Sequence, residues 1–318
     1  MKTLGLALLT ILFASASVAQ TPRPPQPPAQ KPDQDTTIRV NATLVNTTFT
    51  TADKKGKFVT NLKQDDFKVY EDDKLQSISN FSTETNLPLS ISLLVDTSGS
   101  IRDKLSFEQE AAIDFFYNTI KKGKDRGMVI SFDSAVSIEQ EFSDDPEVLS
   151  KAIRKIKAGG GTSLYDAVFL AINERLAKES EDRRRVMILI SDGDDNSSRV
   201  SLTETLEVAQ RNNITVYCIS TNQTAYFGSK DQDRGDKTLK KFSEETGGKA
   251  SFPLKISDIG NDFRDIGDEL RSQYTIGYRP TKLEDGTFRK IRIEVASNKN
   301  YKARHRTGYY APKPVSKN

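Results

Sequence analysis

Apolar and polar residues alternate along the first folded stretch of the chain, which predicts β-strands. The alternation begins near residue 37 and is clearest in Ile38, Val40, Ala42 and Leu44. Two further stretches, residues 67–70 and 78–81, show the same two-residue period, and no helical period interrupts them. We therefore expect an N-terminal β segment over residues 37–84.

The pattern changes at residue 87 to apolar runs that alternate with helical stripes. The run LPLSISLLV is nearly continuous, as expected for a strand buried on both faces of a parallel sheet. Similar runs predict strands at residues 127–132, 186–191, 214–220 and 250–254. Apolar residues at helical spacing predict helices after residue 100, at about 145–157, at 163–178, from 201, at 236–246 and at 258–273. This alternation predicts an α/β domain over residues 87–273, with a doubly wound, mostly parallel sheet.

The two-residue alternation returns after residue 273, in YTIGY and at residues 291–295 and 301–304. We expect a C-terminal β segment over residues 274–311, followed by a tail at 312–318. A short β segment is marginally stable alone, and the two ends of a domain often lie close together. We therefore expect the two β segments to pair into one small flanking β-sandwich.

The first residues have the pattern of an export signal. Lys2 precedes the apolar stretch LGLALLTILFA, and Ser17-Val18-Ala19 is typical of a cleavage site. We expect a signal peptide at residues 1–19 and an extended proline-rich linker at residues 20–36. The apolar stretch is too short to span a membrane, and no second one follows it. These features predict a secreted or periplasmic protein without a transmembrane segment.

The amino-acid composition limits the classes of partner and the means by which the fold is stabilised. Positive and negative side chains nearly balance, with a formal net charge of +3, so a nucleic-acid partner is not indicated. The single cysteine, Cys218, cannot form an internal disulfide, so we expect the exported domain to be stabilised by its core. Its apolar neighbours in ITVYCIS predict a buried thiol on a strand.

Five oxygen-bearing residues lie where predicted strands end or helices begin. Asp96, Ser98 and Ser100 follow the first strand of the α/β domain, Thr162 lies in the glycine-rich AGGGTS, and Asp192 follows VMILIS. In an open α/β sheet, ligands bind beyond the carboxyl ends of the strands. Two carboxylates and three hydroxyls suit a hard cation, of which Mg²⁺ fits the charge best and Mn²⁺ and Ca²⁺ are alternatives. Taken alone, DTSGS is equally compatible with a serine-capped turn into a helix.

The partial positive charge of helix N-termini is expected to oppose a cation at this place. Ser98, Ser100 and Thr162 all precede predicted helices, and Asp96 and Asp192 supply the offsetting negative charge. A cation held by this set would remain electrophilic. We therefore expect it to accept an acidic group from a partner.

The three sequence features together resemble a von Willebrand factor type A domain with its metal-ion-dependent adhesion site (MIDAS). These features are D-x-S-x-S after an apolar strand, a G-G-T loop and a later S-D-G at a strand end. The resemblance covers about residues 87–273. The flanking stretches LKQDDFKVYEDDKLQSISNF, YTIGYRPTKLEDGTFRKIRIEV and RHRTGYYAP are similar to bacterial secreted proteins described as VWFA-related.

The resemblance implies a role for each of the five residues. Ser98 and Ser100 would bind the metal through their hydroxyls, Thr162 would bind it in the ligand-competent state, and Asp96 and Asp192 would act through coordinated waters. A carboxylate of a protein partner would complete the octahedron. The implied function is a non-enzymatic binding module for adhesion or complex assembly. The sequence indicates neither the partner nor the oligomeric state.

Two other functions remain open at this stage. In the first, the β segments mediate assembly as in a structural protein and the metal is dispensable. In the second, the chain is a hydrolase, because the stretches around Asp96 and Ser163 superficially resemble segments of subtilisin-like proteases. That chemistry needs a histidine base, and the single histidine, His305, lies on a predicted surface strand. The GGGT loop lacks the lysine of a P-loop, so a nucleotide is not indicated.

Further charged residues near these segments are interpreted as surface features. Asp133, Asp194 and Asp195 are expected to lie at the rim of the site without binding the metal directly. The run Arg183-Arg184-Arg185 enters a predicted strand and is expected to form a solvated edge.

Overall fold

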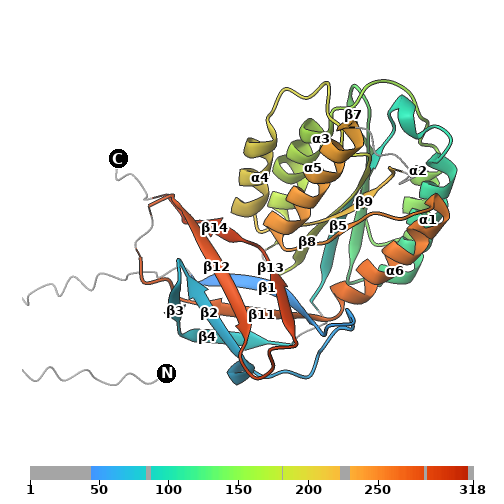
Figure 1. Cartoon of the computed structure of the whole chain (residues 1–318). Helices are drawn as coiled ribbons and strands as arrows, with labels where there is room; N and C mark the ends of the chain where they lie inside the picture. Colours follow the sequence, from blue (N-terminus) through green and yellow to red (C-terminus); the bar gives the residue numbers. More distant parts are fainter. Residues whose placement is uncertain (1–43, 84–86, 181, 223–229, 283–284, 314–318) are drawn as a thin grey trace, which may run out of the picture. The chain divides into compact units, whose positions relative to one another are not determined.

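The structure is a computed structural model that describes residues 44–83, 87–180, 182–222, 230–282 and 285–313 (Figure 1). Within these residues, one sheet has six strands in the order β10-β9-β8-β5-β6-β7. Two further sheets have four strands each, in the orders β13-β1-β11-β4 and β14-β12-β2-β3. The predicted signal peptide and linker, together with Ile38, Val40 and Ala42, lie outside the described residues.

The six-stranded sheet is mostly parallel, as predicted. Its parallel strands are β5 (Leu89–Asp96), β6 (Arg126–Phe132), β8 (Arg184–Ser191), β9 (Thr215–Ser220) and β10 (Ala250–Ser251). The sequence pattern did not indicate β7 (Val136–Ser143), which pairs antiparallel with β6 at the edge of the sheet. This strand carries polar residues in EQE and is only partly buried, so its pattern is weaker than that of the buried parallel strands.

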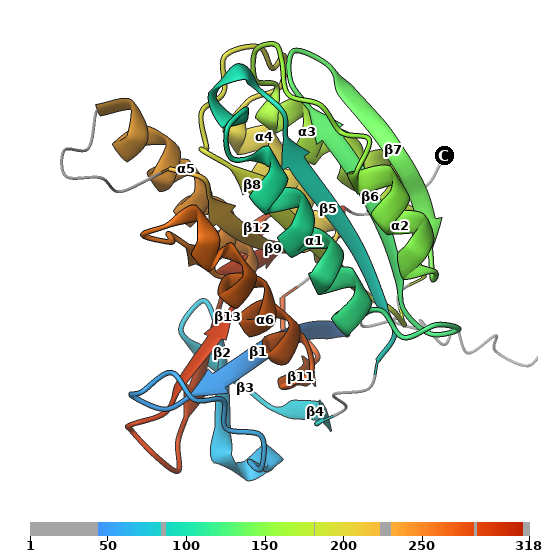
Figure 2. The same ribbon diagram turned by 90° about the vertical axis from the view of Figure 1, so that its right-hand side faces the viewer.

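Helices cover both faces of this sheet, which is the doubly wound arrangement (Figures 1 and 2). The first face carries α1 (Leu105–Thr119), α2 (Pro146–Ile153) and α6 (Ile259–Leu270). The second carries α3 (Leu164–Leu170), α4 (Leu202–Arg211) and α5 (Lys230–Thr246), and α3 continues into a π-helical turn at Ala171–Arg175 and a 3₁₀ turn at Leu176–Lys178. Successive strand residues point to opposite faces, so Leu93 packs in the first core and Leu94 in the second. No helix among the described residues is long and apolar enough to cross a membrane.

The two predicted β segments pair with each other, as expected. In one sheet, β1 (Val45–Ala52) and β4 (Ile78–Ser82) pair with β11 (Gln273–Tyr278), and β1 also pairs with β13 (Lys302–His305). In the other, β2 (Phe67–Glu71) pairs with β3 (Lys74–Gln76) and with β12 (Phe288–Val295), which also pairs with β14 (Gly308–Tyr310). All of these pairs are antiparallel. A shared apolar core joins the sheets into a sandwich, in which the rings of Phe49 and Phe67 meet edge to face at 5.0 Å.

The first described strand has the opposite phase to the alternation that suggested it. Leu44 is 37% exposed, whereas Val45 and Phe49 are buried in the sandwich core. The apolar alternation noted in the sequence ends at Leu44, and β1 begins one residue later. Because the side-chain period of a strand is two residues, this shift of one residue exchanges the buried face and the exposed face.

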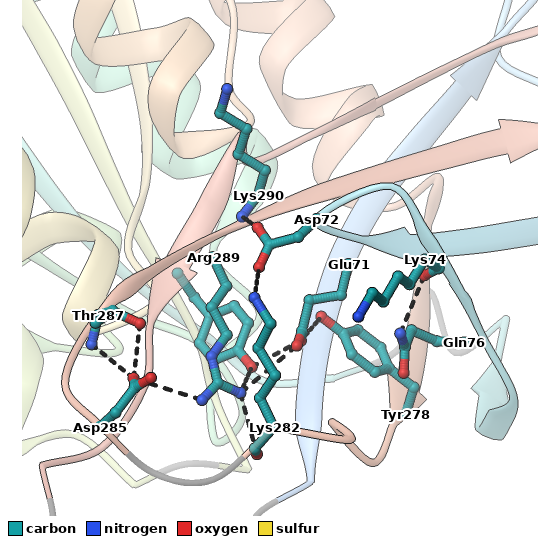
Figure 3. A network of polar contacts seen from close by, with 11 residues as sticks. Glu71, Asp72, Lys74, Gln76, Tyr278, Lys282, Asp285, Thr287, Arg289 and Lys290 are labelled. Atoms are coloured by element: carbon teal, nitrogen blue, oxygen red, sulfur yellow. Dashed lines mark hydrogen bonds and ion pairs between the residues drawn. The ribbon is translucent and has the colours of Figure 1, made fainter.

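A buried ionic network joins four strands inside the sandwich (Figure 3). Arg289 of β12 and Glu71 of β2 are each almost fully buried, and their charged groups lie 3.5 Å apart. Glu71 also accepts hydrogen bonds from the hydroxyls of Tyr278 on β11 and Tyr309 on β14. The side chain of Asp285 lies 3.5 Å from the other end of the Arg289 guanidinium. The buried arginine is thus matched by carboxylates on both sides, as a buried charge requires.

The arginine run at the start of β8 is not a solvated edge, and that expectation is wrong. Arg184 is 7% exposed and donates to the carbonyl of Leu270 at the end of α6. Arg185 donates to the carbonyl of Asn212 after α4, and Arg183 to the carbonyl of Lys124. The last carbonyls of a helix lack partners within the helix and carry partial negative charge. The arginine run therefore donates hydrogen bonds to backbone carbonyls, among them those at the ends of α4 and α6, near the amino-terminal ends of the parallel strands.

His305 is a partly buried structural residue rather than a surface residue. Its Nε2 accepts a hydrogen bond from the backbone N–H of Ile293 at 3.1 Å, and its Nδ1 donates to the carbonyl of Arg306 at 2.7 Å. This pattern requires a neutral ring, because a protonated Nε2 cannot accept a hydrogen bond. Burial lowers the pKa of His305 in the folded state.

The contribution of His305 to stability should therefore fall as the pH decreases below about 6.5, where the unfolded chain binds a proton on this histidine and the folded chain does not. In the variant His305→Gln this contribution is absent. We expect the urea midpoint to change less between pH 7.5 and pH 5.0 in His305→Gln than in the parent protein. Equal changes in the two proteins would contradict this assignment.

Candidate metal centre

The candidate residues lie at the carboxyl ends of two neighbouring strands. β5 and β8 are parallel neighbours, with Leu94 opposite Leu189 and Val95 opposite Ile190. Asp96 ends β5, and Asp192 follows directly after β8. In the strand order, β6 is the neighbour of β5 on one side, and β8, which comes later in the chain, is its neighbour on the other side. This reversal is the switch point at which open α/β sheets bind ligands.

A chain of hydrogen bonds joins four of the five predicted residues. Asp96 accepts from the backbone N–H of Ser98 at 2.9 Å. The hydroxyls of Ser98 and Ser100 lie 2.9 Å apart, and the Ser100 hydroxyl donates to Asp192 at 2.9 Å. Because Ser100 has one hydroxyl proton, Ser98 is the donor in the contact between the two serines. The structure thus brings Asp96, Ser98, Ser100 and Asp192 into one oxygen-rich cluster.

Thr162 lies on a loop that is bonded to the same cluster. The N–H of Gly99 donates to the carbonyl of Gly160 at 3.2 Å, and the N–H of Gly159 donates to the carbonyl of Thr97 at 2.6 Å. Thr162 is buried, and its N–H donates to the side chain of Asn196 at 3.0 Å. Within the described residues, no hydrogen bond joins the Thr162 hydroxyl to the other four side chains. Its loop, not its side chain, is therefore what the structure fixes beside the cluster.

The electrostatics of the cluster favour a cation. Asp96 is fully buried, and burial raises its pKa to about 6 against the opposing effect of the hydrogen bond from Ser191; nearby Asp192 raises it further. Two carboxylates that are held so close repel each other in the ionised state. A divalent cation would remove this repulsion and stabilise the ionised form of Asp96.

A third acidic residue, Glu108, is buried beside this cluster, and its role was not indicated by the sequence pattern. Glu108 of α1 is fully buried, and neither of its carboxylate oxygens has a hydrogen-bond partner among the described residues. Burial raises the pKa of Glu108 to about 8, and Asp96 and Asp192 raise it as well, whereas Lys104 lowers it. The glutamate lies on one helix face with the buried Leu105 and Ala112, and this helical spacing is the signal that could have indicated its burial.

The expected repulsion between a bound cation and the helix N-termini is largely removed by contacts of the loops. The N–H groups of Tyr165 and Asp166 in the first turn of α3 donate to the side chains of Asp195 and Ser198. α1 does not follow Ser100 directly, because a 3₁₀ turn at Gly99–Ile101 precedes it and the helix begins at Leu105. The unpaired N–H groups that would repel a cation are therefore capped or displaced.

The rim aspartates hold loops in place. Asp194 lies 3.3 Å from the guanidinium of Arg234, and Asp195 caps α3 as described above. The carbonyl of Asp133 accepts from the N–H of Ser163 at 2.7 Å, which anchors the loop that carries Thr162. Asp194 and Asp195 thus use their carboxylates in loop contacts, whereas Asp133 anchors its neighbouring loop through its backbone carbonyl.

Three positioning contacts were not recognised from the sequence. The Ser191 hydroxyl donates to Asp96 at 2.6 Å, and the side-chain amide of Asn222 donates to the carbonyl of Asp192 at 3.0 Å. Gly193 has a φ of +82°, and a Cβ placed there would lie 2.2 Å from the carbonyl oxygen of Gly235 in α5. The glycine in S-D-G is the signal that could have indicated this close packing of two backbones.

The donor set fits a hard cation with open coordination positions. Its contributors are carboxylate and hydroxyl oxygens, and its exposed side is formed by Ser100. Among the described residues, no three His, Cys, Asp or Glu side chains are grouped so as to hold a metal ion by themselves. A metal here would therefore depend on the serine and threonine hydroxyls and on water or an outside ligand.

The structure does not assemble the parts of a serine hydrolase. Asp96 and Ser163 lie at the carboxyl edge of the six-stranded sheet, whereas His305 lies on β13 in the sandwich (Figure 1). Both nitrogens of His305 are engaged by backbone groups, as described above. The histidine is thus not placed to act as the base of Ser163.

Replacing Gly235 by alanine should weaken metal binding. Its Cβ would lie 2.1 Å from the carbonyl oxygen of Asp192, so α5 and the loop must separate. We expect Gly235→Ala to lower Mn²⁺ affinity about tenfold or more, measured by calorimetric titration, since small displacements of a ligand are costly. Gly260→Ala in α6 is the control, because no atom lies within 4 Å of its added Cβ. Equal affinities in the two variants would show that this close packing does not position Asp192.

Comparison with known proteins finds a family model and two relatives that are similar to parts of this chain. Residues 91–194 match the family model of the von Willebrand factor type A domain. An uncharacterised protein of Synechocystis is 33% identical over 114 residues, which cover 35% of this chain and 26% of that protein. An uncharacterised protein of Borreliella burgdorferi is 22% identical over 206 residues, which cover 64% of this chain and 58% of that protein. The chain thus spans about a quarter and somewhat over half of the lengths of these relatives.

A solved structure shows the same fold. The proximal thread matrix protein 1 of the mussel byssus, in a form with a zinc-occupied MIDAS motif, superimposes with a TM-score of 0.50. The superposition covers 64% of this chain and 50% of the mussel protein, at 15% identity. At this identity the likeness concerns the fold alone. Together with the family match over β5 to β8, it shows that the α/β domain has the von Willebrand factor type A fold.

Proposed function

We propose that this protein is a non-enzymatic binding module that holds a divalent cation, Mg²⁺ in the first instance, and uses it to grip a carboxylate of a protein partner. The observation that carries the proposal is the cluster of Asp96, Ser98, Ser100 and Asp192 at the switch point of the sheet, joined by hydrogen bonds of 2.9 Å. The family match and the fold support a metal-dependent interaction module in general.

The proposed roles follow from what each residue offers. The hydroxyls of Ser98 and Ser100 would bind the cation directly, and Thr162 would join them when a partner is bound. Asp96 and Asp192 would act through coordinated waters, with Ser191 orienting Asp96. The cation supplies an electrophilic position for an outside oxygen. The chain itself supplies the negative charge that retains the cation and the rigid strand ends that hold its ligands.

We also propose that the protein is exported and acts outside the cytoplasm, on the strength of the signal-like residues 1–19. The division into an N-terminal β segment, an α/β domain and a C-terminal β segment at residues 37–84, 87–273 and 274–311 is retained as part of this proposal. The alternative is assembly through the β segments with a dispensable metal. No part of partner capture would then be lost when a chelator removes the metal.

Removal of one central carboxylate tests the proposal. Asp96→Asn keeps the size of the buried residue, removes its charge and replaces one of its two acceptor oxygens by an N–H donor group. We expect the parent protein to bind Mn²⁺ or Mg²⁺ at one saturable site in calorimetric titration, and Asp96→Asn to lose at least about tenfold in affinity, because the local charge that retains the cation is lost.

Asp114→Asn is the matched control, because Asp114 is an exposed residue of α1 outside the cluster. It should bind the metal as the parent does. Absence of metal binding by the parent protein, or equal binding by the parent and Asp96→Asn, would count against the proposed site.

A further inference from the structure

A second polar cleft lies at the opposite end of the parallel strands from the candidate metal centre. Its volume is about 780 Å³, within the usual range of ligand sites. It is lined by the starts of β8 and β1, the turn after α4, part of β4 and the segment between β13 and β14. The cleft therefore lies where the α/β domain meets the sandwich.

The charges that line this cleft are strongly unequal. Its described lining residues include five arginines and one carboxylate, the exposed Asp182; the arginines are Arg183, Arg184, Arg185, Arg211 and Arg306. Two of the arginines have acidic partners, because Arg211 pairs with Glu207 at 2.8 Å and Arg183 lies 3.6 Å from Glu179. The amides of Asn46, Asn80 and Asn213 add neutral donors and acceptors to the wall.

Arg306 is a buried cation without a carboxylate at ion-pair distance among the described residues. It is 8% exposed. One end of its guanidinium donates to the carbonyl of Asn46 at 2.9 Å and to the Thr47 hydroxyl at 3.4 Å, and its Nε is buried without a partner. Its remaining contact is with the ring of Tyr309, at 5.5 Å. Burial lowers the pKa of Arg306 to about 10, which reflects the cost of holding this charge away from water.

Two other arginines have carboxylate partners. The buried Arg289 lies between Glu71 and Asp285, and the partly exposed Arg304 is paired with the buried Glu269. Arg185, by contrast, resembles Arg306, because it has no carboxylate at ion-pair distance among the described residues and donates to the carbonyls of Asn212 and Glu179. Arg185 and Arg306 thus line one cleft without a carboxylate partner among the described residues, and backbone carbonyls satisfy only part of their hydrogen-bonding capacity.

We propose that this cleft binds an acidic peptide segment of a partner protein, with Arg306 and Arg185 holding its carboxylates. The excess of arginine over aspartate gives the charge complementarity, and a guanidinium binds a carboxylate with directed hydrogen bonds. The asparagine side chains provide partners for peptide groups. The cleft volume accommodates several residues, so the site is larger than a single inorganic anion requires. The site is separate from the metal centre and does not depend on the proposed cation.

The test uses the full chain in excess EDTA, so that a metal-bound carboxylate cannot contribute. The probe is a fluorescently labelled hexapeptide of glutamate at low ionic strength, and binding is followed by anisotropy. We expect saturable binding that weakens strongly at 0.5 M NaCl, since exposed charge interactions are screened. Hexalysine should not bind. Inorganic phosphate should compete only weakly, and phosphate binding without peptide binding would overturn the assignment to a peptide.

Two substitutions locate the binding site without removing the most buried arginine. Arg185→Gln should lower peptide affinity about tenfold or more, the usual effect of losing a charge-assisted hydrogen bond. Asn213→Asp places a negative charge at an exposed turn of the cleft wall and should also weaken binding. Arg154→Gln, a surface arginine on the other side of the sheet that pairs with Glu110, is the control and should bind as the parent does. Unchanged binding in both cleft variants would overturn the proposal.

Discussion

The parallel pairing of β5 with β8 is the contact on which the rest of the site depends. It sets Leu94 against Leu189 and Val95 against Ile190, so the chain segments that follow the two strands emerge side by side. Each segment then contributes a carboxylate, and the hydroxyls of Ser98 and Ser100 bridge them. Two adjacent carboxylates, one of them fully buried, repel each other when both are ionised, and this repulsion is present in the fold when no cation is bound. Both the proposed metal and the proposed partner carboxylate follow from this arrangement.

The two ends of the same sheet carry opposite chemistry. At the carboxyl ends of the strands, Asp96 and Asp192 form an acidic cluster with Glu108 buried nearby, and a side chain caps the N-terminus of α3. At the amino-terminal ends, arginines meet the carbonyls that end α4 and α6. The sandwich closes over this second end and encloses part of the arginine-lined cleft. A module of this form would present one cation-dependent site and one cation-independent site to acidic partners.

The sequence predicted those features that depend on local periodicity and on short motifs. The parallel strands, both layers of helices and the oxygen cluster follow from apolar runs and from DTSGS and SDG, whose positions are fixed by strand ends. Features that depend on partners distant in sequence were missed. The half-exposed β7, the phase of β1 at Val45, the burial of Glu108 and the docking of Arg184 on the end of α6 are decided by what packs against them. The metal itself and the five proposed ligand roles still need a direct experiment.

Anomalous diffraction from crystals of the protein soaked in Mn²⁺ is that experiment, because it locates the cation without assuming its ligands. We predict one strong anomalous peak in coordinating contact with the hydroxyls of Ser98 and Ser100, with Asp96 and Asp192 adjacent to it and Thr162 on its flank. The same soak of Asp96→Asn crystals should show no peak at this position. No peak there in parent crystals at saturating Mn²⁺, or a peak bound by other residues, would contradict the proposed centre and the binding function built on it.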